Sequence, residues 1–158
     1  MDIQYLKHKV ECGADFIITQ ASYSFNSYKN FVKISRSSGI HVPIIPGMFI
    51  IKSHRSLLAI SEFCAVPIPP DILRVVSNIK GNNESILNFG MDFAIELTRK
   101  FLSRRDLFEN VHYFCLNDLS IVERVIKILG IYDNYMERPI VNLENKFIKY
   151  FKEENRIQ

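Results

Sequence analysis

The stretch GADFIITQASYSF, residues 13–25, decides the fold class of this chain. It opens on a glycine, continues as an apolar run and reaches a polar amide, Gln20, before small and aromatic residues follow. A short apolar run bounded by turn residues is typical of a strand that is buried on both faces. We therefore expect a strand over residues 15–20, with Gln20 at its carboxyl end.

Amphipathic segments flank this strand. Residues 2–12 place apolar side chains at helical spacing, with Asp2 at the N-cap position, and residues 27–39 form a second helical pattern that ends at a glycine. Residues 42–51 are again continuously apolar and predict a second strand. The remaining elements are expected as a helix over 54–64, a short helix near 71, a helix over 84–103, a strand over 111–117 and a helix over 119–130.

Apolar strands that alternate with helices favour the α/β class, with parallel strands joined by helical crossovers. The sheet order should follow the chain order, with Gln20, Pro46 and Asn117 at one end of the three strands. Ligands bind at the carboxyl ends of parallel strands, so Gln20 is a candidate binding residue. The alternative is that its amide only caps a neighbouring backbone group.

Length and charge exclude several functions. The chain has 158 residues, enough for one domain, and its net charge of +3 comes from 20 basic and 17 acidic residues without a basic stripe. We therefore expect no nucleic-acid partner. No apolar run approaches the roughly 20 residues of a membrane span, and the N-terminus does not resemble a signal peptide. These features predict a cytoplasmic protein with no membrane contact.

The cysteines and histidines show no metal-binding spacing. The three cysteines are far apart and flanked by apolar residues, which is typical of a reducing compartment, and the four histidines are equally scattered. We predict no metal site and structural or surface roles for Cys12, Cys64, Cys115, His8, His41, His54 and His112.

Several blocks of the sequence, in order and at matching spacing, resemble the methylenetetrahydrofolate reductase family. They are LKHKVECGADFIITQ (6–20), GIHVPIIPGMF (39–49), IPPDI (68–72), NFGMDFAIEL (88–97) and VHYFCLN (111–117). The resemblance covers about residues 1–132 and corresponds to the C-terminal part of the catalytic domain. Residues 133–158 are expected to form a linker and a charged helical tail.

The resemblance implies a fold and a reaction. The chain would be the last three strands, with their helices, of a TIM-type (β/α)8 barrel. Members of the family hold FAD, which carries a hydride from NAD(P)H to 5,10-methylenetetrahydrofolate and gives 5-methyltetrahydrofolate, a step of one-carbon and methionine metabolism.

The resemblance also implies roles for individual residues. It places Gln20 against the folate substrate, and Asp2 and Lys9 against the flavin. At two further folate positions, where the family commonly has tyrosine and arginine, this chain has Phe114 and Asp118. An anion in place of a cation opposes binding of the folate carboxylates.

The resemblance assigns no catalytic residue to this chain, because the family's general acid belongs to an earlier strand of the barrel. Three strands cannot close a barrel. We therefore expect a truncated form with little activity and weak FAD binding alone. The alternative is a non-catalytic interaction module that pairs with an intact reductase subunit or another protein.

Overall fold

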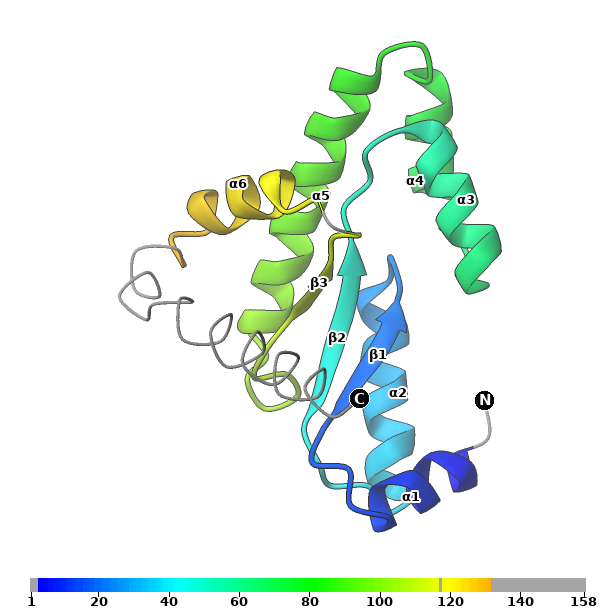
Figure 1. The fold of residues 1–158 in the computed structure, drawn as a ribbon, viewed down its shortest axis with the longest axis vertical. Helices are drawn as coiled ribbons and strands as arrows, with labels where there is room; N and C mark the ends of the chain where they lie inside the picture. The colour runs from blue at the N-terminus through cyan, green and yellow to red at the C-terminus, as the bar shows by residue number, and fades with distance from the viewer. Residues whose placement is uncertain (1–2, 117, 132–158) are drawn as a thin grey trace, which may run out of the picture. The chain divides into compact units, whose positions relative to one another are not determined.

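The structure, a computed structural model, describes residues 3–116 and 118–131 (Figure 1). Its sheet has three strands, β1 (Ile17–Ala21), β2 (Ile44–Phe49) and β3 (His112–Phe114). Both pairs are parallel, and the spatial order β1-β2-β3 follows the chain. The predicted class, strand direction and order are confirmed.

All six expected helices form. They are α1 (Ile3–Glu11), α2 (Phe25–Ser37), α3 (His54–Cys64), α4 (Pro70–Asn78), α5 (Asn83–Leu102) and α6 (Ser120–Ile128). Local polar residues fix three of the starts, because the side chains of Ser24, Ser53 and Asn82 each accept a hydrogen bond from a backbone N–H of the first turn. Helix α2 begins two residues earlier than its pattern predicted, because Ser24 is its cap.

The strands are staggered, which corrects the expected position of their ends. Ala21, the last residue of β1, is level with Gly47 of β2, and Gly47 is in turn level with His112, the first residue of β3. Pro46 therefore lies inside β2 and not at its end, and β1 extends one residue past Gln20. Asn117 lies outside the described residues. Stagger between neighbouring strands is what a barrel requires, since its strands tilt relative to the barrel axis.

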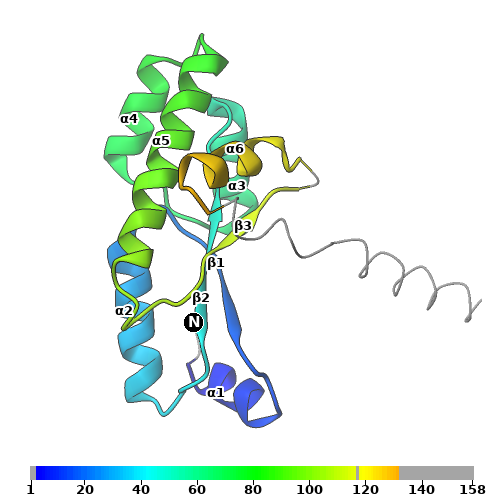
Figure 2. The ribbon, with the colours of Figure 1, turned by 90° about the vertical axis from the view of Figure 1, so that its left-hand side faces the viewer.

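Helices α2 and α5 pack on the same face of the sheet (Figures 1 and 2). The core between them includes a cluster of aromatic rings, in which Phe101 contacts Tyr28 and Phe108 edge to face at 5.1 and 5.0 Å between centroids. On the opposite face the side chains are less covered: Ile18 is 43% exposed and Gln20 is exposed. The two faces of the sheet therefore differ in how far they are covered within this chain.

Helix α5 lies against the segment that follows β2 at Gly90. A Cβ atom at this position would lie 2.0 Å from the carbonyl oxygen of Ile51, just beyond the end of β2. Only glycine permits this contact. Ile51 belongs to a second core cluster, formed by Tyr23, Ile51, Leu57, Val66, Ile72, Val76 and Ile86.

The predicted linker and charged tail over residues 133–158 lie outside the described residues. Among the residues that are described, no helix combines the length and the apolar character needed to cross a membrane.

Candidate functional site

A pocket of about 80 Å³ opens at the carboxyl ends of β2 and β3. Its lining includes an aromatic pair, Phe49 of β2 and Phe114 of β3, with ring centroids 5.0 Å apart; this pair is called the floor below. The ring of His112 lies edge-on to Phe114 at 4.5 Å. The rest of the lining comes from the segment after β2, from α3, from the loop after β3 and from α6: Ile50, Lys52, Ser56, Ile60, Cys115, Leu116, Asp118 and Val122.

Two partly exposed lining residues, Lys52 and Asp118, form an ion pair and are called the rim of the pocket below. The Nζ atom of Lys52, three residues beyond β2, lies 2.7 Å from Oδ2 of Asp118, four residues beyond β3. The other carboxylate oxygen, Oδ1, accepts a hydrogen bond of 2.7 Å from Oγ of Ser120. The hydrogen bond from Lys52, and then that from Ser120, lower the pKa of the Asp118 carboxyl from its usual value of 3.8. The anion at position 118 is therefore already paired with a cation.

Sequence reasoning missed Lys52. The signal was present, since Lys52 is the first polar residue after the apolar run VPIIPGMFII, residues 42–51. The rule that selected Gln20, a polar side chain at the carboxyl end of a parallel strand, selects Lys52 equally well.

Gln20 lines a different pocket, of about 310 Å³, between β1, α1 and α2. Its Oε1 atom accepts a hydrogen bond of 3.0 Å from the backbone N–H of Ala21. This hydrogen bond agrees with the alternative considered from the sequence, that the Gln20 amide caps a neighbouring backbone group. The pocket walls are largely apolar and include Leu6, Ile17, Ile18, Tyr28 and Phe31.

Tyr28 of α2 fixes the loop that follows Gln20. Its hydroxyl accepts a hydrogen bond of 2.6 Å from the backbone N–H of Ser22. The carbonyl oxygens of Ser22, at 3.0 Å, and of Gly47 both lie within reach as acceptors for its single proton. Burial raises the pKa of this phenol. Tyr28 therefore ties the end of β1 to the middle of β2.

Tyr23, in the same loop, belongs to the core cluster that includes Ile51 and Leu57. It is 5% exposed, and its hydroxyl has no hydrogen-bond partner among the described residues. Burial, and to a smaller extent the neighbouring thiol of Cys64, raise the pKa of Tyr23 to about 12. The phenol is therefore neutral at physiological pH and serves as packing.

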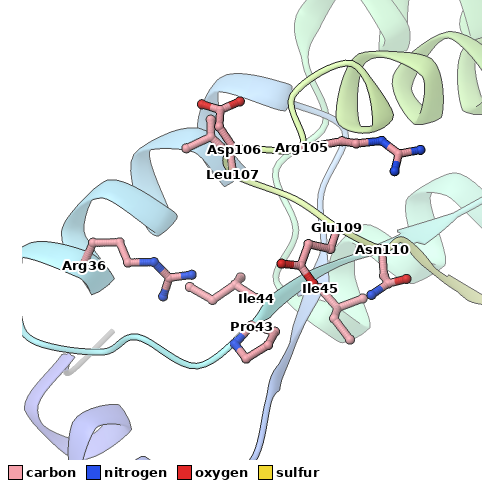
Figure 3. A pocket seen from close by; sticks show the side chains of 9 residues that line it. All are labelled: Arg36, Pro43, Ile44, Ile45, Arg105, Asp106, Leu107, Glu109 and Asn110. Carbon is pink, nitrogen blue, oxygen red and sulfur yellow. The ribbon is translucent and has the colours of Figure 1, made fainter.

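A third pocket, of about 70 Å³, lies at the amino ends of β2 and β3 (Figure 3). Arg36 of α2 donates through Nη1 to the carbonyl oxygens of Ile40 and Val42, at 2.7 and 3.0 Å, and so holds the loop that enters β2. Ligands bind at the opposite ends of parallel strands. We assign this pocket a structural role.

The structure brings some predicted residues together and separates others. Phe114 and Asp118 line one pocket, and Gln20 lines another. Lys9 is exposed on α1, where its Nζ atom lies 4.6 Å from the ring centre of Tyr5. Asp2 lies outside the described residues. The described part of the chain contains no group of three or more His, Cys, Asp or Glu side chains that could hold a metal ion.

Comparisons with known proteins agree on one family. A family model described as methylenetetrahydrofolate reductase matches residues 1–130. Methylenetetrahydrofolate reductase (NADH) 1 of Arabidopsis thaliana is 33% identical over 132 residues, which cover 84% of this chain and 22% of that protein. The probable methylenetetrahydrofolate reductase (NADPH) of Caenorhabditis elegans is 30% identical over 131 residues, covering 83% of this chain and 20% of that protein.

The 5,10-methylenetetrahydrofolate reductase of Pectobacterium carotovorum is shorter than these relatives. It is 26% identical over 130 residues, which cover 82% of this chain and 43% of that protein. The chain thus spans about a fifth of the length of the plant and nematode relatives and less than half of the bacterial one.

A solved structure has the same fold. An uncharacterized protein from Clostridium thermocellum, described as binding two copies of 5-methyl-5,6,7,8-tetrahydrofolic acid, superposes with a TM-score of 0.57. It is 18% identical, and the match covers 80% of this chain and 46% of that one. The three parallel strands and their helices therefore form part of a (β/α)8 barrel.

Proposed function

Because the chain belongs to the methylenetetrahydrofolate reductase family, we propose that it forms the folate-binding side of a flavin-dependent reductase of 5,10-methylenetetrahydrofolate. The observation that carries the proposal is the pocket at the carboxyl ends of β2 and β3, where an aromatic floor meets a charged rim. Such a combination suits a ligand with a flat ring and carboxylates.

Gln20, Phe114 and Tyr28 have different proposed roles in this site. Gln20 offers both a donor and an acceptor to the edge of a pterin or nicotinamide ring once its carbonyl leaves the N–H of Ala21. Phe114, paired with Phe49, provides an apolar surface for the folate. Tyr28 positions Gln20 indirectly, since its hydroxyl joins Ser22, two residues after Gln20, to Gly47 of β2.

The cofactor of the proposed reaction is FAD, which when bound carries the hydride from NADH or NADPH to the folate. The side chain of Lys9 is suited to binding FAD, because its exposed ammonium can pair with the pyrophosphate of the cofactor. Asp2 is proposed as its companion. These are few contacts, so the chain's own share of the flavin site is small.

A chimera tests this proposal. The matching segment of the Pectobacterium protein is replaced by residues 1–130 of this chain, and flavin absorbance and folate reduction are measured. We expect a yellow protein with measurable activity. Gln20→Leu in the same chimera should reduce activity by about tenfold or more, the value of one lost hydrogen bond to the reacting ligand. A chimera that folds and retains flavin but has no activity would contradict the proposal.

A second candidate function is an interaction module, and exposed apolar residues in α1, in β1 and just before β1 favour it. Phe16 is 53% exposed, Tyr5 60% and Ile18 43%. Large exposed apolar side chains at and near an edge strand are typical of a surface that another segment covers. Flavin retention without folate reduction in the chimera is the outcome that would favour this function.

A further inference from the structure

We propose that Lys52 recognises the glutamate carboxylate of the folate, and that Asp118 is a positioning residue that holds the Lys52 ammonium until that carboxylate replaces it. The inference rests on the proposed function and assigns the substrate-specificity residue of the same pocket.

The backbone around Lys52 is anchored on both sides. Ile51 is 2% exposed and packs beneath Gly90 of α5. Ser53 is the N-cap of α3 and forms a reciprocal capping box with Ser56, with hydrogen bonds of 3.1 Å in each direction. The start of the Lys52 side chain is therefore fixed, and only its flexible end has to adjust to a ligand.

The pocket supplies two features that match folate. Lys52 is the one cationic side chain among the described residues that line it, and it lies beside the floor formed by Phe49 and Phe114. The p-aminobenzoylglutamate part of folate is a flat apolar ring followed by carboxylates. Stacking on the floor would bring a carboxylate to the rim, where the ammonium is.

Asp118 fits the role of a temporary partner. The side chains of Lys52 and Asp118 are 34% and 48% exposed. When a ligand carboxylate takes the place of Asp118, the ammonium stays paired, and the released Asp118 stays solvated and keeps its bond from Ser120. An exchange of one carboxylate for another therefore leaves no buried charge unpaired, which keeps its cost low.

Pairing with Lys52 is a different role for Asp118 from repulsion of the folate carboxylates, which its negative charge alone would predict. If Asp118 only repelled folate, Lys52 would not matter for binding. If Asp118 competes for Lys52, binding depends on both residues, and removing the Asp118 charge helps only while Lys52 is present.

Two ligands with the same ring system separate these possibilities. 5-Methyltetrahydrofolate and the carboxamide of 5-methyltetrahydropteroate share the pterin and the p-aminobenzamide, and only the first carries the glutamate carboxylates. Protein-observed NMR titration of the full chain can measure even weak affinities for both. We expect the glutamate-bearing ligand to bind about threefold to tenfold more tightly to the wild-type chain, as for a partly exposed charge-assisted hydrogen bond.

Substitutions of Lys52 and Asp118 should change the preference for the glutamate-bearing ligand in opposite directions. Lys52→Met should abolish the preference for the glutamate-bearing ligand, and Asp118→Asn should increase it. In the double variant the preference should stay absent. Lys7→Met is the matched control, because Lys7 also forms a partly exposed ion pair, with Glu11 at 4.0 Å, but on α1. This control should keep the wild-type preference.

The failures are distinguishable. If neither ligand binds the wild-type chain, the proposed function is contradicted and this inference falls with it. If both bind but the wild type shows no preference, or Lys52→Met keeps it, the assignment of Lys52 is wrong while the proposed function stands. An unchanged or smaller preference in Asp118→Asn would overturn the positioning role of Asp118.

Discussion

Gly90→Ala is the substitution that most directly tests how α5 and β2 hold the candidate site together. In an isolated helix, alanine in place of glycine is favourable by about 1 kcal/mol, so local propensity alone predicts a more stable protein. The structure predicts the opposite. The added Cβ would lie 2.0 Å from the carbonyl oxygen of Ile51, 2.8 Å from its carbonyl carbon and 2.9 Å from its Cβ.

The size of the expected loss of stability depends on which atoms must move to relieve the clash. Two of these three contacts are with backbone atoms, so relief requires α5 or the segment after β2 to shift by more than about 1 Å. Overpacking of this kind costs about 1–3 kcal/mol, and a clash with backbone belongs at the upper end. After the gain in helix propensity, we expect a net loss of about 2 kcal/mol and a fall in Tm of roughly 4–8 °C.

Urea unfolding followed by circular dichroism measures this loss. Gly81→Ala is the control, because a Cβ at Gly81 meets nothing within 4 Å, and it should leave stability nearly unchanged. A Gly90→Ala variant as stable as the wild type would refute the close approach of α5 to Ile51. A second consequence is a displaced Lys52, which NMR shifts of Lys52 and Asp118 would report.

Two further predictions concern the loop after β1 and the rim of the pocket. Tyr28→Phe should lower the free energy of unfolding by about 1–3 kcal/mol, because the backbone N–H of Ser22 loses its partner; urea unfolding measures it, and an unchanged midpoint would show that the hydroxyl does not tie β1 to β2. Asp118 has a lowered pKa in the folded chain, so its pairing stabilises the fold above the usual value of 3.8 and is lost as the pH falls through the lowered value. The stability difference between wild type and Lys52→Met should therefore be present at about pH 6 and vanish in strong acid, whereas parallel pH profiles of the two proteins would argue against the pair.

The sequence by itself determined the parts of this protein that depend on neighbouring residues. Apolar runs and helical spacing set three strands and six helices, and their alternation set the parallel α/β class. Capping residues such as Ser53 act within one turn, which is why the predicted bounds of α3 match those observed. The blocks that resemble the family were equally readable, since they are contiguous.

The tertiary structure decided what depends on register and helix crossing. The stagger that places Pro46 inside β2, the approach of Gly90 to Ile51, and the bond of Tyr28 to the loop before it all require elements to be docked. The Lys52–Asp118 pair joins residues 66 positions apart. A side chain's partner at that separation follows from which strands are neighbours and how far each is shifted, and no local pattern in the chain encodes that shift.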